Sequence, residues 1–242
     1  MAVSIKSARE IKLMREAGKR LAHVHQELEA MITPGISTWE IDAKGEKLIR
    51  DCGCIPNFLH YNGYPASICV SVNDEVVHGI PRKDRYLKEG DIVSLDAGLI
   101  YKGYHSDAAR THAVGKVSTE AQKLMDVTKQ SFFEGIKMAK EGQHLHDISR
   151  AIEEYVTPYG YGIVRDLVGH GIGTALHEDP QIPNYAQKRR GVRLQAGMTL
   201  AIEPMINAGT WQVRFLRDGW TVVTKDGSLS AHYENTILVT DG

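Results

Sequence analysis

An internal repeat at a constant spacing of 107 residues constrains the fold of this 242-residue chain more than any other feature. Residues 33–53 (TPGISTWEIDAKGEKLIRDCG) align with residues 140–160 (KEGQHLHDISRAIEEYVTPYG). The same spacing, without a gap, aligns residues 88–96 (KEGDIVSLD) with residues 195–203 (QAGMTLAIE). Glycines recur after helices because they cap them. One spacing shared by two separated blocks nevertheless indicates two duplicated structural units.

Two helices are expected at the start of the first unit. Apolar residues at helical spacing begin after Ser7, which can cap the helix together with Glu10, three residues later. A second helix is predicted over residues 38–51, with Trp39 and Ile41 among its apolar positions. Short strand-like segments, ASICVSV and DIVSLDAGLI, follow between turn-rich pieces. Each unit therefore resembles a helix pair followed by strands.

No linker-like stretch separates the two units. We therefore predict an α+β fold in one domain, residues 1–242, built from two structural repeats at about 7–120 and 121–242. If the repeats pair about a pseudo-two-fold axis, Asp96 and Glu203 occupy equivalent places near that axis.

The charge balance argues against a nucleic-acid or membrane partner. The chain has 29 basic and 30 acidic residues and a formal net charge of -1. No run approaches 18 apolar residues, and the start of the chain lacks an apolar targeting segment. Three cysteines, an odd number without a zinc-like pair, argue for a reducing compartment. We expect a soluble, cytoplasmic monomer that binds neither DNA nor membranes.

Two carboxylates flank a predicted hairpin loop, YKGY. Asp96 and Asp107 would then lie opposite each other or one register step apart, on the same face of neighbouring strands. Carboxylates on directly opposed residues, with Cβ atoms about 5 Å apart, repel each other. For these two acids alone, a shared proton or salt bridges to Arg110 and Lys102 would be a sufficient explanation.

Two further acids make a metal site the better explanation. Glu203 lies in TLAIEPMI and Glu234 in SAHYENTILVT, both interpreted as apolar strands. Burying unpaired carboxylates is very costly. One divalent ion does not balance four such groups, whereas two do.

Histidines supply nitrogen ligands near these acids. His170 and His177 lie in the glycine-rich segment VGHGIGTALHEDP, and His78 follows a predicted strand in VVHGIP. Neutral imidazole is a common ligand of catalytic metals, and a mixed oxygen-rich set favours Mn, Fe, Co or Zn over a structural thiolate zinc. The chain lacks the motifs GxSxG, GxxxxGK[ST], HExxH and GxGxxG with its distal acid.

Five segments together resemble a known family. They are NGYPASICVSVNDEVVHGIP, GDIVSLDAGLIYKGYHSDAART, GHGIGTALHEDP, MTLAIEPM and DGWTVVTKDGSLSAHYENTILV. The chain is similar, from about residue 7 to residue 240, to the type I methionine aminopeptidases, in their bacterial form. The resemblance implies the pita-bread fold, in which helices cover an antiparallel sheet. It also implies removal of the initiator methionine from nascent chains whose second residue is small, with two divalent ions as cofactor.

The resemblance assigns metal ligands residue by residue. It implies that Asp107 and Glu234 bridge the two ions, that Asp96 completes the shell of one, and that His170 and Glu203 complete the shell of the other. Water activated between the ions would attack the first peptide carbonyl.

The resemblance also implies which residues contact the substrate. Glu203 would accept and pass on the proton, His177 would lie near the scissile amide, and His78 near the leaving side. The methionine pocket would consist of Phe58, Tyr61, Tyr64, Cys69, Leu176 and Trp220.

Three positions depart from the family pattern. Relatives often have an aromatic residue where this chain has Leu176, and a smaller residue where it has Phe58, so one substitution would offset the other in pocket volume. His232 stands where glutamine is common, and its role is open.

Two alternatives remain. An X-Pro aminopeptidase or prolidase would share the fold, although such enzymes usually have a large additional N-terminal domain. A non-catalytic pita-bread protein would bind peptide, RNA or ribosomes, but such relatives typically lose ligands. The basic segment QKRRGVR, residues 187–193, could still support transient ribosome association through phosphate contacts.

Overall fold

The computed structural model describes residues 3–241, so the initial Met1–Ala2 dipeptide, which fits the substrate specificity implied above, lies outside the described residues. The helices are α1 (Ala8–Glu29), α2 (Thr38–Asp51), α3 (Thr119–Ile136), α4 (Leu145–Val156) and the short 3-10 helices η1 (Tyr61–Gly63) and η2 (Thr157–Tyr159). The strands of the first half are β1 (Ile55–Pro56), β2 (Ile68–Val72), β3 (Glu75–Val77), β4 (Ile92–Tyr101) and β5 (Tyr104–Ala113). Those of the second half are β6 (Gly162–Ile163), β7 (Gly169–Gly171), β8 (Glu178–Ile182), β9 (Thr199–Ile202), β10 (Met205–Asn207), β11 (Val213–Phe215), β12 (Val222–Thr224), β13 (Ser230–His232) and β14 (Asn235–Leu238).

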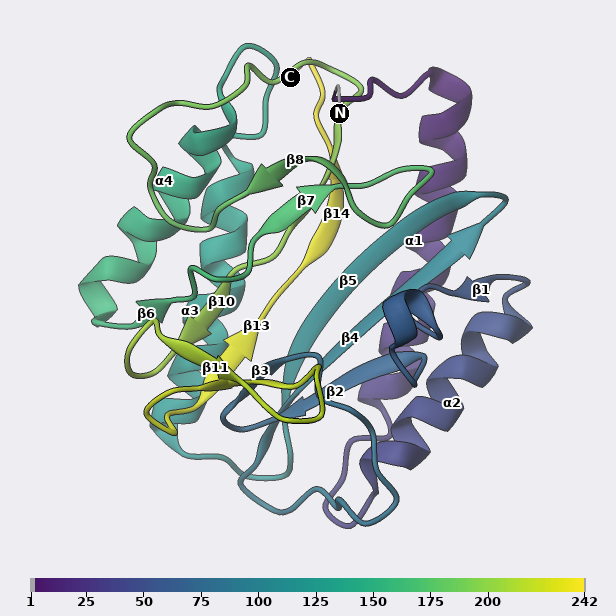
Figure 1. The fold of residues 1–242 in the computed structure, drawn as a ribbon, viewed down its shortest axis with the longest axis vertical. Coiled ribbons are helices and arrows are strands. Elements are labelled where there is room, and N and C mark those ends of the chain that lie inside the picture. Colours follow the sequence, from purple (N-terminus) through teal and green to yellow (C-terminus); the bar gives the residue numbers. More distant parts are fainter. Residues whose placement is uncertain (1–2, 242) are drawn as a thin grey trace.

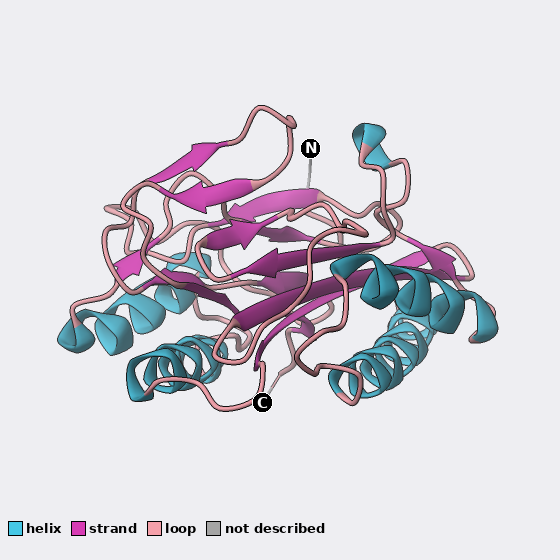
Figure 2. Ribbon diagram, turned by 90° about the horizontal axis from the view of Figure 1, so that it is seen from below, coloured by secondary structure: helices cyan, strands magenta, loops and turns pink. Residues whose placement is uncertain are grey.

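The four α-helices lie in two pairs, α1 with α2 and α3 with α4, on one face of the strands (Figures 1 and 2). The strands form sheets of order β1-β4-β2 with β5 on β4, β14-β9-β7-β8, β13-β10-β6 and β11-β12-β3. All the strand pairs described are antiparallel. The predicted α+β class is therefore confirmed.

Each helix pair covers its own hydrophobic core. The first core includes Ile41 and Leu95, and the second includes Ile148 and Ile202, which lie 107 residues further on and are equally buried. Full burial of such a side chain contributes about 1.5–3 kcal/mol. The strands above the helices are thereby held against two separate apolar layers.

Backbone conformation also matches at the spacing of the repeat. Gly35 and Gly142 have φ angles of 94° and 85°, and Gly90 and Gly197 have 90° and 93°. Residues with a side chain rarely adopt these positive φ angles, so a glycine is favoured at each position. We interpret the two halves as structural repeats of one domain.

The helix predictions are largely confirmed. Ser7 caps α1 in a capping box, its N–H donating to Glu10 Oε2 over 2.7 Å, and α2 has the predicted bounds. The assignment of Trp39 to the apolar face is wrong, because its side chain is 41% exposed and lies beneath Lys83 Nζ, 4.6 Å from the ring centre. A cation–π contact with a lysine can stabilise an exposed tryptophan ring that does not pack into the core. None of the helices within residues 3–241 is long and apolar enough to span a bilayer.

Candidate metal centre and substrate pocket

A cavity of about 180 Å³ lies between the two halves, and every residue predicted for the site lines it. Its walls also include Asn62, which the sequence reasoning missed because an asparagine beside a glycine reads as an ordinary turn. The complete lining is Phe58, Tyr61, Asn62, Tyr64, Cys69, His78, Asp96, Asp107, His170, Leu176, His177, Glu203, Trp220 and Glu234.

The β4–β5 hairpin positions the two aspartates. Its two-residue turn, residues 102–103, has positive φ at both positions, the conformation that matches the twist of paired strands. The resulting register sets Asp96 opposite Ala109 and Asp107 opposite Gly98. The aspartates are therefore diagonal neighbours on one face, not directly opposed, and both point into the cavity.

The two glutamates are held differently from the prediction. Glu203 falls between β9 and β10, followed by Pro204, which has no N–H for a ladder. Glu234 falls between β13 and β14, where its N–H and carbonyl exchange hydrogen bonds of 3.0 and 3.3 Å with Ala109. The expectation that both glutamates lie within continuous strands is wrong, because each strand breaks at its glutamate. These breaks place both side chains on the cavity.

The pKa values of the four buried acids are all raised, so their ionised forms are disfavoured. Burial raises the pKa of Asp96, Glu203 and Glu234 well above the usual range, and repulsion from Asp107 raises it further. Burial also raises the pKa of Asp107 to about 7, although hydrogen bonds from Asp96 and the Ala108 backbone oppose the shift. Four carboxylates in such surroundings need protons or cations.

Unpartnered atoms favour cations. Within residues 3–241, Asp96 Oδ1, Asp107 Oδ1 and Glu234 Oε1 are buried without a hydrogen-bond partner. Buried polar atoms normally have partners, and three orphaned carboxylate oxygens facing one cavity fit oxygen ligands of a hard or borderline divalent ion.

Two overlapping sets of side chains have ligand atoms close enough for an ion. One set is Asp107, His170 and Glu234, and the other is Glu203, His232 and Glu234, with all ligand atoms of a set within 4.8 Å of one another. Glu234 belongs to both. The residues present therefore fit divalent metal.

His170 is arranged as a ligand. Its Nδ1 lies 2.8 Å from the carbonyl of Gly171, so Nδ1 carries the proton and Nε2 keeps its lone pair. Nε2 lies 3.7 Å from Glu203 Oε1. Burial lowers the pKa of His170 to about 4 and that of His232 to about 3, so both rings are neutral near pH 7.

Aromatic and imidazole rings form the other wall. His177 Nδ1 lies 2.8 Å from the hydroxyl of Tyr61, and its ring centre lies 4.3 Å from that of His170. Trp220 packs edge-on against Tyr64 and His78, with ring centres 5.1 and 6.2 Å apart. The pocket is thus apolar on its walls and polar at its metal end.

Phe58 and Leu176 both line this cavity and belong to one hydrophobic cluster. Phe58 therefore does not point away, and the idea that the two compensate in volume stands as a prediction. Cys69, opposite Asp96 across β2 and β4, has a thiol pKa raised well above its usual value by burial and by Asp96. It is an inert apolar wall of the pocket.

His78 occupies a left-handed conformation, with φ of 59°. Non-glycine residues pay about 1–2 kcal/mol for this region, and such strain concentrates at functional sites. The next residue, Gly79, cannot carry a side chain, since a Cβ would lie 2.3 Å from the carbonyl of Val70. The close packing of Gly79 against Val70 fixes the backbone at this point, and it holds the His78 ring beside Trp220.

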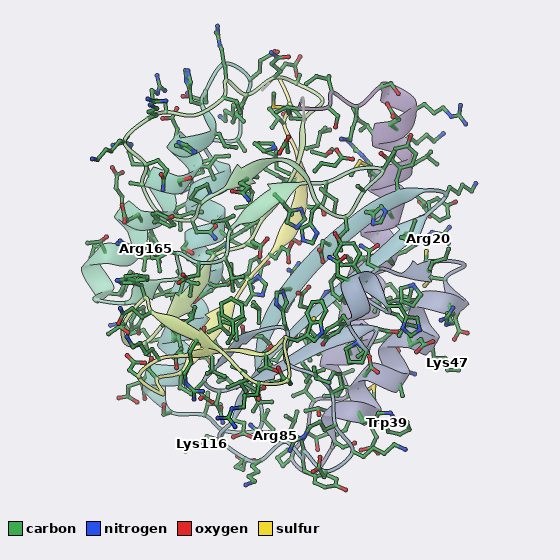
Figure 3. The ribbon with its side chains drawn as sticks, in the orientation of Figure 1. Arg20, Trp39, Lys47, Arg85, Lys116 and Arg165 are labelled. Carbon is green, nitrogen blue, oxygen red and sulfur yellow. The ribbon has the colours of Figure 1, made fainter. Side chains whose placement is uncertain are left out.

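The basic segment 187–193 lies outside this cavity. Arg190 pairs with Asp147 over 2.5 Å, and the carbonyl of Arg189 lies 2.6 Å from His146 Nδ1. Nearby, Arg165, labelled on the α4 side in Figure 3, stacks over Trp211 at 4.9 Å. Ribosome docking by this segment stays a prediction, for which salt-sensitive co-sedimentation with ribosomes is the test.

Comparison with known proteins identifies the fold and family. The profile of metallopeptidase family M24 matches residues 12–241. The chain is 53% identical over 239 residues to the methionine aminopeptidase of Clostridium acetobutylicum, covering 99% of this chain and 96% of the relative. It is 52% identical to methionine aminopeptidase 1 of Bacillus subtilis over 236 residues, covering 98% and 95%.

Solved structures agree. The crystal structure of methionine aminopeptidase from Thermotoga maritima superposes with a TM-score of 0.97 at 46% identity, covering 100% of this chain and 97% of that one. The prolidase of Pyrococcus furiosus, with a TM-score of 0.77 at 23% identity, shares the fold alone, and this chain spans 63% of it. The pita-bread prediction is thus confirmed, and the chain belongs to metallopeptidase family M24, within which it is a methionine aminopeptidase.

Proposed function

We propose that this chain removes the N-terminal methionine from nascent peptides whose second residue is small, and that it does so with two divalent ions held by its four buried acids and His170. The observation that carries the proposal is the single cavity that joins these acids to an apolar aromatic pocket. Either feature alone would fit many proteins, whereas together they describe a metal-dependent exopeptidase.

The ligand roles are those that the family resemblance implies. Asp107 and Glu234 would be shared by both ions; Asp96 would serve one, and His170 with Glu203 the other. In support, Glu234 belongs to both sets of side chains whose ligand atoms lie close together. When bound, the two ions supply a lowered pKa for water between them and polarise the peptide carbonyl. Mn, Fe, Co and Zn all suit this mixed donor set.

Glu203 would accept the proton of the attacking water and pass it to the leaving amine. Burial and Asp107 raise its pKa well above the usual range, which suits a carboxylate that accepts and releases a proton. His177 would donate a hydrogen bond from Nε2 to the developing oxyanion. The Tyr61 hydroxyl assists when it donates to Nδ1, because this leaves the proton of His177 on Nε2.

Specificity would arise at the two ends of the cavity. A methionine side chain, flexible and polarisable, suits the pocket walled by Tyr64, Trp220 and Leu176. The strained turn at His78 would crowd the side of the second residue and favour a small one. The Asp96 side of the acids would take the free α-amino group, which restricts cleavage to N-terminal residues.

A direct test compares turnover of the peptides Met-Ala-Ser and Ala-Pro-Ser by protein reconstituted with Co²⁺ or Mn²⁺, before and after chelation. We expect release of methionine from the first peptide only, and its loss on chelation. Preferential cleavage of Ala-Pro-Ser would instead indicate a proline-directed enzyme, and no cleavage by fully loaded protein would indicate a binding protein.

A further inference from the structure

His232 is buried next to the metal centre without any assigned role. Its side chain is 1% exposed, and neither ring nitrogen has a hydrogen-bond partner among the described residues. Nε2 lies 3.7 Å from Glu203 Oε2 and 3.9 Å from Glu234 Oε2. Burying an imidazole with two unsatisfied nitrogens costs free energy. The role of His232 should therefore involve the two nearby carboxylates.

The spacing is wrong for hydrogen bonds but suits a shared cation. Hydrogen bonds from nitrogen to oxygen span about 2.7–3.2 Å. Two atoms that each lie about 2.0–2.2 Å from one ion can be up to about 4.3 Å apart. His170 Nε2 has the same 3.7 Å spacing to the other oxygen of Glu203, so the carboxylate has an imidazole facing each oxygen.

The pseudo-symmetry of the fold supports this reading independently. Thr236 Oγ1 accepts the N–H of Asp107 over 2.9 Å and donates to its carbonyl over 3.1 Å. Thr111 Oγ1 makes the same pair of contacts with His232, over 2.8 and 2.9 Å. His232 therefore occupies, in the second half, the backbone position that the central ligand Asp107 occupies in the first.

We propose that His232 is a sixth metal ligand, binding through Nε2 an ion that it shares with Glu203 and Glu234. One ion would then gain an extra nitrogen donor, while the ion on the Asp96 side keeps oxygen donors. A neutral imidazole adds this bond without disturbing the balance between four carboxylates and two dications. The inference rests on the proposed metal centre and adds a metal preference to it, since imidazole favours Zn, Co or Fe over Mn.

The direct test is proton NMR of the protein loaded with two equivalents of Co²⁺. Each imidazole bound to Co²⁺ gives a strongly shifted, solvent-exchangeable N–H signal. We expect two such signals in the natural protein, from His170 and His232, and one in His232→Gln. As a matched control, His112→Gln removes another histidine with an unpartnered ring nitrogen from outside the cavity and should keep both signals.

The outcomes separate the inference from the proposed function. Two bound Co²⁺ ions with a single signal in the natural protein overturn the role of His232 and leave the proposed function intact. Absence of bound Co²⁺ overturns both. The natural protein decides the question even if the variant folds poorly.

Calorimetric titration of metal-free protein gives a second readout. His232→Gln should weaken one of the two binding events at least about ten-fold, and more for Zn²⁺ than for Mn²⁺. Equal weakening for both metals would mean that His232 only positions its neighbours, which contradicts the ligand role.

Discussion

The two halves of the molecule share a backbone plan but hold their acids in different ways. In the first half, Asp96 and Asp107 project from the interior of the regular strands β4 and β5. In the second half, Glu203 and Glu234 stand at breaks between strands. If the two halves are structural repeats, as we infer, they share the path of the backbone near the pseudo-axis but differ in local geometry at the acids.

The chemistry of the halves differs as well. The imidazoles of His170 and His232, whose Nε2 atoms lie 3.7–3.9 Å from carboxylate oxygens of Glu203 or Glu234, both come from the second half. The position equivalent to His232 in the first half is an acid, Asp107. A symmetric scaffold therefore carries an asymmetric donor set, and the two metal positions should differ in affinity and preference. Four predictions test this comparison.

The largest effect is expected at the central acid of the first half. Asp107→Ala removes a carboxylate that belongs to the cluster and repels each of the other three acids. We expect turnover to fall by about a thousand-fold or more, because metal ions lower the barrier of such reactions by several kcal/mol. The amount of bound metal should fall as well. Metal analysis and peptide turnover measure both. Asp84→Ala, an exposed acid, is the control, and retained turnover in Asp107→Ala would contradict the bridging role.

Removal of metal should make stability fall with rising pH. Burial raises the pKa of Asp107 from 3.8 to about 7, so its contribution to stability is complete below about pH 4 and lost as the pH rises through 7. Burial also raises the pKa of Glu203 and Glu234 well above the usual range, so both acids contribute a loss of stability in the same direction. Buried His170 and His232, with lowered pKa values, act oppositely, but their contribution is complete above about pH 6.5.

Thermal melts above about pH 6.5 therefore report the buried acids without a changing contribution from these two histidines. The melting temperature of chelated protein should fall as the pH rises through about 7, while that of metal-loaded protein changes little. Parallel curves for the two forms would mean that the acids are stabilised by something other than metal.

The two non-ligand histidines, one from each half, should behave alike. His78→Ala and His177→Ala should each lower turnover about a hundred-fold, the scale of a positioned hydrogen-bonding group, and leave metal content unchanged. His60→Ala, a histidine with φ of 67° outside the cavity lining, is the control. Loss of metal from either cavity variant would show that its histidine is a ligand.

The smallest effect is expected at two glycines that have the same backbone conformation in the two halves but different neighbours. Gly90 and Gly197 have φ of 90° and 93°, so alanine at either site should cost about 1–2 kcal/mol in strain. At Gly197 the added Cβ would also lie 2.8 Å from Ile5 Cγ2 and 3.1 Å from the Lys6 carbonyl, whereas at Gly90 the nearest atom is 3.9 Å away. Urea unfolding should show Gly197→Ala to be the more destabilised by about 1 kcal/mol or more. Equal losses of unfolding free energy in the two variants would mean that the segment around Ile5 and Lys6 moves aside at little cost.

The sequence predicted the elements that depend on local signals. The capping box at Ser7, the bounds of α2 and the turn of the β4–β5 hairpin all follow from residue type and spacing. The constant spacing of the repeat also predicts that Asp96 and Glu203 are equivalent, which stays a prediction. These features need no knowledge of tertiary contacts.

Other features depend on partners that are distant in sequence. The break at Glu234 lies where its backbone pairs with Ala109 across the pseudo-axis, and an apolar stretch does not show this. The exposure of Trp39 depends on Lys83, and the contact of His232 with the acids depends on strands that are remote along the chain. Tertiary geometry therefore decides which polar groups face the cavity.

Anomalous diffraction from crystals grown with Mn²⁺ or Co²⁺ tests the central claim most directly, namely that the buried acids of both halves are held by two cations. We predict two anomalous peaks in the cavity, both adjacent to Glu234 and Asp107. Full metal loading with no peak there, and the four carboxylates paired with one another through protons or water, would contradict it.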